Sequence, residues 1–150
     1  MYEQTTIAAI ATPPGEGGIG IIRLSGIDAA EIANRMFETK KLHNFHDAVP
    51  YMMYYGKVMD NDRIVDRGLA VYMKAPQSYT GEDVVEFQMH GSVEALRSVL
   101  SLALRHGAVP ADKGEFTKRA FLNGRIDLAQ AESVMDIITA RGQAALVQAE

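Results

Sequence analysis

The feature that most constrains the fold is a glycine-rich segment between two apolar runs near the N-terminus. Residues 13–20 hold two prolines followed by four glycines. The flanking residues 6–12 and 19–25 are rich in isoleucine, so we expect two strands joined by a loop. The glycines suit a tight turn, and they equally suit a loop that presents backbone N–H groups to an anion. No Gly-Lys-Ser/Thr follows, which excludes a P-loop, and the position between strands argues against a dinucleotide fingerprint.

Alternation and turn signals predict further strands in the first two thirds of the chain. Residues 28–38 predict a helix whose N-cap is the Asp28 side chain. Residues 49–59 and 64–74 are rich in Tyr, Val and Met and are separated by a short polar turn, which predicts a hairpin. Residues 83–90 predict one more strand.

Helical periodicity dominates the remainder of the chain. Residues 92–106 carry an apolar stripe that ends at a glycine, and residues 115–122 predict a short helix. A last helix is expected to begin at Asp127, with Gln130 three residues later as the second half of a capping box. It runs to Glu150 without a stop signal, so we expect a helix cut by the end of the chain and an apolar stripe left partly exposed. A natural terminus that frays is the alternative.

These elements predict an α+β fold, with a mixed sheet of about five strands, packed helices and a C-terminal helix. The 150 residues suffice for one domain with a real core. The net charge of −4 argues against a chain that binds nucleic acid as a whole, so any RNA contact must be local or come through partners. The absence of cysteine excludes a disulfide, a thiolate metal site and a thiol nucleophile. Neither a signal peptide nor an apolar run of membrane-spanning length is present, so we expect a cytoplasmic protein with no membrane span.

Two strand faces carry candidate binding residues. In residues 83–90, alternation places Glu86 and His90 on one face and the apolar residues on the other. Such a face is either simply solvated or aims a carboxylate at a heterocycle, whose ring N–H and amino group can donate to two oxygens. His90 is a candidate base or ligand, but no second cluster accompanies it, so no metal site is expected. Arg23 shares an apolar face, where it either pairs with a carboxylate or offers its fork to a ligand.

The segment 113–125 is locally cationic in an acidic chain. Its four basic residues are Lys113, Lys118, Arg119 and Arg125. They form either a solvated helix face or an anchor for an anionic tail of a ligand.

Three motifs occur in order along the chain. The first comprises Ala11 to Gly15 and Gly18 to Gly26, the second runs from Ser78 through Glu86 to Gly91, and the third runs from Gly114 to Glu132. Together they resemble the N-terminal region of the MnmE (TrmE) family of tRNA modification GTPases. The resemblance implies that residues 1–124 form a tetrahydrofolate-binding and dimerisation domain similar to that of aminomethyltransferases. Residues 125–150 would be the first helix of a helical domain, whose G domain and C-terminal region this sequence lacks.

The resemblance also implies the ligand and the residues that bind it. Folate contacts carried over from the family fall on Arg23, Glu86 and Arg125, with no catalytic residue and no metal ligand in the chain. Glu86 would hold the amino-pyrimidine edge of the pterin, and the arginines would donate to carbonyls or carboxylates. The family usually has lysine in place of Arg125, which keeps the charge but changes its geometry. The implied cofactor is 5-formyl-tetrahydrofolate or a related one-carbon folate.

The implied role belongs to a larger assembly. Such a protein is a homodimer that works with the flavoprotein MnmG on carbon 5 of the tRNA wobble uridine, installing an aminomethyl or carboxymethylaminomethyl group. GTP hydrolysis with magnesium and potassium would occur in the G domain, so these 150 residues are not expected to be catalytic alone. The alternatives are a stand-alone folate-dependent one-carbon transferase and a purely structural dimerisation domain.

Overall fold

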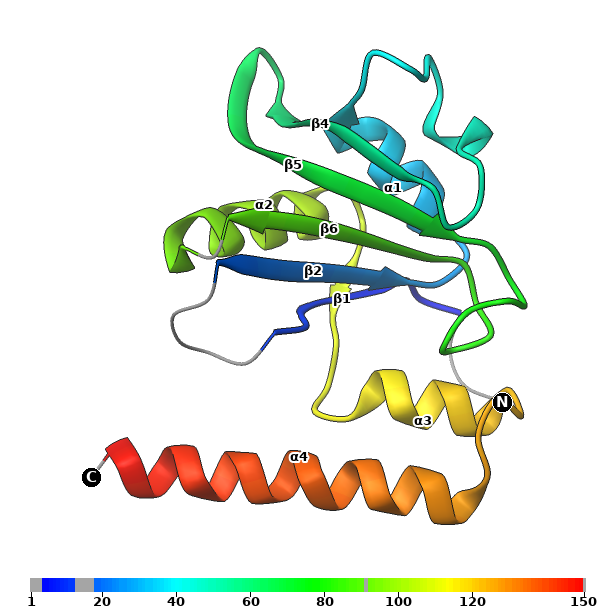
Figure 1. Ribbon diagram of the computed structural model, residues 1–150, viewed down its shortest axis with the longest axis vertical. Coiled ribbons are helices and arrows are strands. Elements are labelled where there is room, and N and C mark those ends of the chain that lie inside the picture. Colours follow the sequence, from blue (N-terminus) through cyan, green and yellow to red (C-terminus); the bar gives the residue numbers. More distant parts are fainter. Residues whose placement is uncertain (1–3, 13–17, 91, 150) are drawn as a thin grey trace.

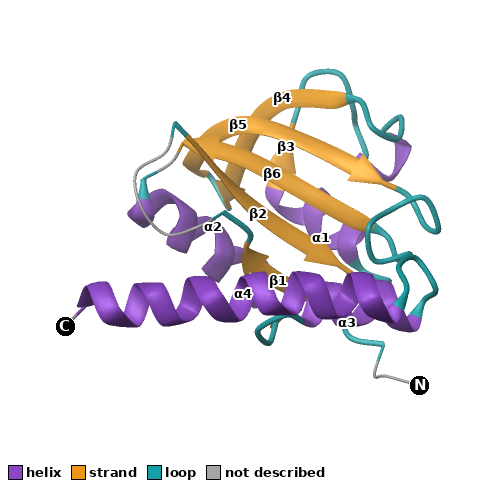
Figure 2. Ribbon diagram, turned by 60° about the horizontal axis from the view of Figure 1, so that its bottom comes forward, coloured by secondary structure: helices purple, strands orange, loops and turns teal. Residues whose placement is uncertain are grey.

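A seven-stranded mixed sheet forms the centre of the molecule (Figures 1 and 2). The computed structural model describes residues 4–12, 18–90 and 92–149, with side chains up to residue 141. The strands are β1 (Ile7–Ile10), β2 (Ile19–Ser25), β3 (Phe37–Glu38), β4 (Met53–Asp60), β5 (Arg63–Met73), β6 (Val84–His90) and β7 (Val109–Pro110). Their order across the sheet is β3-β4-β5-β6-β2-β1-β7. The neighbouring strands are antiparallel except β1 and β7, which are parallel.

This sheet confirms the predicted α+β class. The five longer strands are those that the sequence pattern predicts, including the β4–β5 hairpin. The two further strands, β3 and β7, have two residues each, which is too short to produce a recognisable alternation. Most of the predicted glycine loop, residues 13–17, lies outside the described residues.

Two helices cover one face of the sheet, and two lie beside the end of the sheet that carries β1. The helices are α1 (Ala29–Met36), the 3₁₀ turn η1 (Phe45–Asp47), α2 (Val93–Arg105), α3 (Glu115–Leu122) and α4 (Leu128–Ala149). Helices α1 and α2 pack behind the sheet in the view of Figure 1 and bury the alternate residues of β2 and β6, such as Leu24 and Phe87. Helices α3 and α4 pack against each other, and Figure 2 shows them in front of β1. Within the described part of the chain, no helix lies on the opposite face of β4, β5 and β6 (Figure 1).

The structure gives Gly20 a packing role. A Cβ atom at this position would lie 2.4 Å from a methyl carbon of Leu96 in α2. Because no side chain fits there, glycine lets the helix approach the sheet closely. One glycine of the N-terminal segment therefore serves the core.

One of the two predicted helix caps is present, and Ser92 caps a further helix. Ser92 accepts a hydrogen bond from Ala95 N–H at 3.2 Å, and Asp127 and Gln130 each accept from the other's N–H, at 2.7 and 2.8 Å. The predicted side-chain cap at Asp28 is wrong. Its φ of −100° and ψ of 11° depart from the extended conformation that turns an N-cap side chain toward the helix.

The last helix is continuous to Ala149, and the apolar residues Val134, Met135 and Ile138 on it are partly exposed, as expected. Met135 lies close to Gly114, just before α3, and Val134 and Ile138 also face this region. Among the described residues, no helix is long and apolar enough to cross a membrane.

Candidate ligand-binding site

Arg23 and Glu86 meet on the side of the sheet that faces away from α1 and α2. Strands β2 and β6 are neighbours, and their register places the two residues directly opposite each other. The Arg23 Nε donates to Glu86 Oε2 at 2.7 Å, and the two side chains are 28% and 15% exposed. The structure therefore brings together two of the three predicted site residues, which are 63 positions apart in the sequence.

An aromatic ring completes the surroundings of this arginine. The guanidinium carbon of Arg23 lies 5.4 Å from the centre of the Phe116 ring in α3, a distance typical of a cation–π contact. Only Nε of Arg23 takes part in the ion pair, and no described residue accepts a hydrogen bond from its two terminal nitrogens. The ion pair and the ring contact thus orient Arg23, while the terminal nitrogens of its guanidinium group remain available to a ligand.

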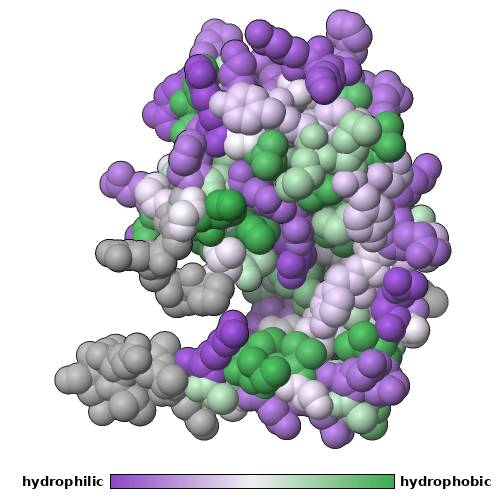
Figure 3. All heavy atoms as spheres, in the orientation of Figure 1, coloured by the Kyte–Doolittle hydropathy of each residue, from purple (hydrophilic) through white to green (hydrophobic). Residues whose placement is uncertain are grey.

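A cavity of about 480 Å³ opens beside Arg23. It is lined by Ala9, Ile10, Ala11, Arg23, Tyr79, Ala111, Asp112, Lys113, Gly114, Phe116, Thr117, Val134 and Ile138. The walls thus come from the β1–β2 edge, the loop before β6, α3 and α4, and Figure 3 shows the hollow between the body of the sheet and α4. Two aromatic rings, an apolar floor and two cations suit a flat heteroaromatic ligand with acidic groups.

Tyr79 is held in place by α3. Its hydroxyl group and that of Thr117 lie 3.0 Å apart, within hydrogen-bond distance. Because both residues line the cavity, this contact links the loop before β6 to the helix on the far wall. Tyr79 was not among the predicted site residues, although its place inside the Ser78–Asp83 motif could have indicated a role in the site.

Arg125 stands apart from the other two predicted residues. Its Nε donates to the Ser78 carbonyl oxygen at 3.0 Å, and its side-chain carbons lie near Gly81. It does not line the cavity, although it holds the loop that carries Tyr79. Its predicted ligand contact therefore stays a prediction, with no direct geometric support.

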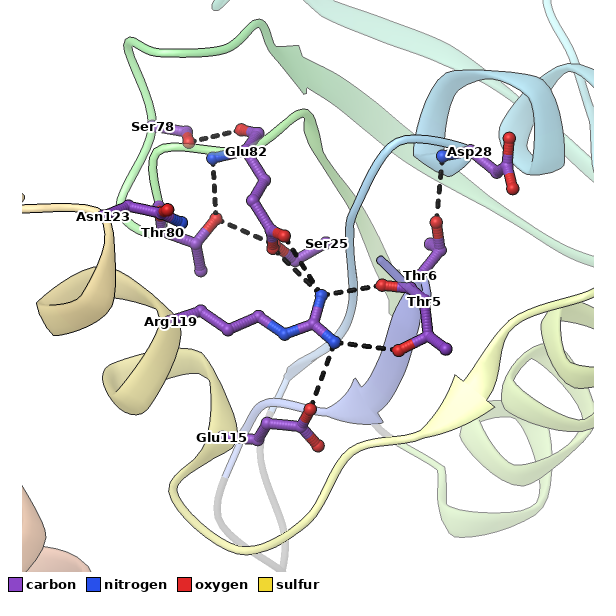
Figure 4. Close-up of polar contacts among 10 residues, drawn as sticks. All are labelled: Thr5, Thr6, Ser25, Asp28, Ser78, Thr80, Glu82, Glu115, Arg119 and Asn123. Atoms are coloured by element: carbon purple, nitrogen blue, oxygen red, sulfur yellow. Dashed lines mark hydrogen bonds and ion pairs between the residues drawn. The ribbon is translucent and has the colours of Figure 1, made fainter. Parts of the chain in front are cut away.

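A buried arginine, Arg119, supports the wall that α3 provides (Figure 4). Its side chain is 2% exposed and donates to both the carbonyl and the hydroxyl oxygen of Thr5, at 2.7 and 2.9 Å. It also pairs with Glu82 and Glu115, each at 3.1 Å. The interpretation of Arg119 as part of an exposed cationic patch is wrong, because α3 turns this residue toward the sheet. The spacing of Glu115 and Arg119, one helical turn apart, was the available signal.

Hydroxyl groups extend this network into the sheet. Ser25 donates to Glu82 Oε1 at 2.7 Å and lies 2.8 Å from the Thr80 hydroxyl oxygen. Asn123 donates to the Thr80 carbonyl oxygen at 2.8 Å. The network therefore fixes the loop before β6 to β2 and α3, and so fixes the position of Tyr79.

The other candidate on β6, His90, lies away from the cavity. Its Nδ1 is 2.9 Å from Asp66 Oδ1, and its side chain is mostly exposed. Within the described part of the chain, no group of three or more His, Cys, Asp or Glu side chains is arranged to hold a metal ion.

Comparison with known proteins identifies the family. Residues 6–125 match the family described as "GTP-binding protein TrmE N-terminus", and the chain belongs to this family. Relatives named tRNA modification GTPase MnmE include those of Roseiflexus sp. (54% identical over the whole chain), Geobacter metallireducens (53% over 97%) and Listeria welshimeri (51% over 96%). The chain spans only 32, 32 and 31% of these relatives, respectively.

Proposed function

We propose that this chain is the folate-binding and dimerisation module of a tRNA modification GTPase, and that its ligand is 5-formyl-tetrahydrofolate or a related one-carbon folate. The observation that carries the folate assignment is Arg23, which lines a cavity of about 480 Å³ and is paired with Glu86, a residue that does not itself line the cavity. A cavity of this size suits a small cofactor.

The chemistry of the walls supports a pterin. Phe116 and Tyr79 offer faces on which a flat ring stacks, and the terminal nitrogens of Arg23 offer donors to a ring carbonyl. Glu86 uses Oε2 for Arg23, and its other oxygen is the acceptor that we assign to the amino-pyrimidine edge. Lys113, and Arg125 beyond the cavity, are the cations for the acidic tail.

Calorimetry with 5-formyl-tetrahydrofolate tests this assignment. We expect Glu86→Gln and Arg23→Gln each to weaken binding roughly tenfold or more, because each removes a charged hydrogen bond to the ligand. The matched control is Glu38→Gln, which neutralises an exposed carboxylate on β3 at the far edge of the sheet. Wild-type affinity in a folded Glu86→Gln protein would reject the site.

Dimerisation is supported by exposed apolar residues near the uncovered side of the sheet. Tyr51, Met52, Met53 and Tyr55 are all exposed and lie on or just before β4. Such clustering is typical of a surface that another protein covers. We expect sedimentation to give a dimer, and Tyr55→Asp to shift the equilibrium toward monomer. A wild-type monomer at concentrations of about 100 μM, a weak-affinity range, would reject this part of the proposal.

In the longer protein, the module would present the folate for modification of the wobble uridine at carbon 5, together with the flavoprotein MnmG. GTP, magnesium and potassium would bind in the G domain outside these 150 residues. A self-contained one-carbon transferase would instead turn over folate with an amine acceptor using this chain alone. A purely structural module would dimerise without any folate-dependent rise in melting temperature.

A further inference from the structure

A second hollow, of about 210 Å³, lies between the β4–β5 hairpin and α2. Its polar lining consists of Arg63, Arg97, Arg105, Ser98, Ser101 and Asp60, and we call it the arginine groove. Helix α2 covers the face of the sheet opposite to the one that carries Arg23 and Glu86. The arginine groove is therefore separate from the proposed folate site.

The groove has a regular helical side. Arg97, Ser101 and Arg105 follow one another at intervals of four residues, so they lie along one face of α2. At 1.5 Å per residue, the two arginines are about 12 Å apart along the helix axis. Ser98 adds a hydroxyl group beside this row, and Arg63 faces it from the start of β5.

The charge of the groove is only partly neutralised. Arg105 Nη2 donates to Asp60 Oδ2 at 3.0 Å and remains 61% exposed. Arg63 and Arg97 form no ion pair with any described residue, although the exposed carboxylates Asp62 and Glu94 are near them in the sequence. By contrast, Arg23 and Arg119 are paired with carboxylates elsewhere in the fold. A neighbouring hollow of about 260 Å³ shares Asp60 and Arg105, but it also holds Glu38, and its Arg35 is paired with Glu31, so the unpaired positive charge of these two hollows is confined to the arginine groove.

We propose that the arginine groove binds the phosphodiester backbone of RNA. This step rests on the proposed function, which makes tRNA the substrate of the whole protein. Guanidinium groups match phosphate oxygens with two parallel hydrogen bonds, and serine hydroxyls are common additional donors to phosphate. A row about 12 Å long is much longer than one phosphate group, so a strand with successive phosphates fits it better than a single phosphate. Because the chain has a net charge of −4, RNA contact has to be local, and the arginine groove is such a local basic site.

Salt-dependent binding of an unmodified tRNA transcript to the 150-residue chain tests this proposal. We expect the double variant Arg63→Gln/Arg97→Gln to bind roughly threefold to tenfold more weakly at low salt. The slope of log affinity against log salt should fall by about 1 for each lost phosphate contact. The control is Arg67→Gln/Arg141→Gln, which removes the same charge from two exposed arginines outside the groove and should change affinity less than about twofold.

Several results would overturn the proposal that the arginine groove binds RNA. No tRNA binding by the wild-type chain, equal losses in both double variants, or no loss in Arg63→Gln/Arg97→Gln would overturn the proposal. Inorganic phosphate that displaces tRNA better than chloride at equal ionic strength would point to a single-anion site and would also overturn it. Calorimetry with 5-formyl-tetrahydrofolate on Arg63→Gln/Arg97→Gln should match wild type. A failure of folate binding is therefore distinguishable from a failure of RNA binding.

Discussion

Arg23 and Arg119 are the same residue type used in two different ways. Arg119 is buried and donates to a backbone carbonyl, a hydroxyl and two carboxylates of its own chain (Figure 4). Arg23 is partly exposed, pairs with one carboxylate and lies against an aromatic ring beside a cavity. The first arrangement holds the fold together, whereas the second leaves donors available to a ligand. The number of internal partners therefore separates a structural arginine from a candidate binding arginine.

The largest effect is expected for Arg119→Met. The substitution leaves the carboxylates of Glu82 and Glu115 without their cation in a largely buried place, which typically costs about 3–5 kcal/mol. Urea unfolding measures the loss of unfolding free energy. Arg119→Lys should recover only part of it, because one ammonium group cannot reproduce the forked contacts. If Arg119→Met loses no more unfolding free energy than Arg23→Gln, Arg119 has no greater structural role than Arg23.

Ser25→Ala tests the same network one step further away. Ser25 is fully buried, and its hydroxyl group lies within hydrogen-bond distance of both Glu82 and Thr80. Without the Ser25 hydroxyl group, Glu82 and Thr80 each lose a hydrogen-bond partner, which should cost about 1–3 kcal/mol of unfolding free energy. The double variant with Arg119→Met should cost less than the two single losses added together, because the residues share Glu82. Strict additivity in urea unfolding would contradict a single network.

Arg23→Gln should change stability less. Arg23 is 28% exposed and makes a single hydrogen bond, to Glu86, whereas Arg119 is 2% exposed and makes several, so we expect a cost of about 1–2 kcal/mol. The expected signature is a modest loss of unfolding free energy together with the weakened folate binding described above. If this variant unfolds as readily as Arg119→Met, Arg23 is a structural residue and the contrast between the two arginines fails.

The smallest effect is expected at a third cluster, whose side chains are about half exposed. Glu31 accepts from the His46 ring at 2.9 Å and from Arg35 at 3.0 Å, and these contacts lower the pKa of the Glu31 carboxyl below 4.5. A lowered folded-state pKa stabilises the protein above the unfolded-state pKa, and this stabilisation is lost as the pH falls through the folded-state value. Glu31→Gln should therefore flatten the acid side of the stability profile slightly. Urea unfolding between pH 3 and pH 7 (about the range in which carboxyl groups titrate) measures it. If the unfolding free energy of Glu31→Gln depends on pH below 7 in the same way as that of wild type, the contacts of Glu31 do not stabilise the fold.

The local elements were largely predictable from the sequence. The helix at 115–122, the β4–β5 hairpin and the Asp127–Gln130 capping box all depend on residues close to one another in the chain. The Asp28 cap failed because the backbone there takes a conformation that the local sequence does not reveal. The two-residue strands β3 and β7 were missed because their pairing depends on neighbours rather than on a pattern of their own.

The candidate site was only partly predictable. Alternation placed Arg23 and Glu86 each on a strand face, but nothing local sets two strands 63 residues apart in register. The helical pattern of 115–122 likewise did not reveal that Arg119 faces inward. The predicted contact of Arg125 remains untested, since its side chain holds the Ser78 carbonyl instead of lining the cavity.

The α+β class, the positions of the main strands and helices, and the resemblance to one family could all be read from the amino-acid sequence. They depend on periodicity, turn chemistry and motifs, which act over a few residues. Which charged residues meet, which are buried and where cavities form became visible only in the folded molecule. Strand register and helix docking are set by burial of the whole apolar core, so the partners of Arg23 and Arg119 appear only once the chain has folded.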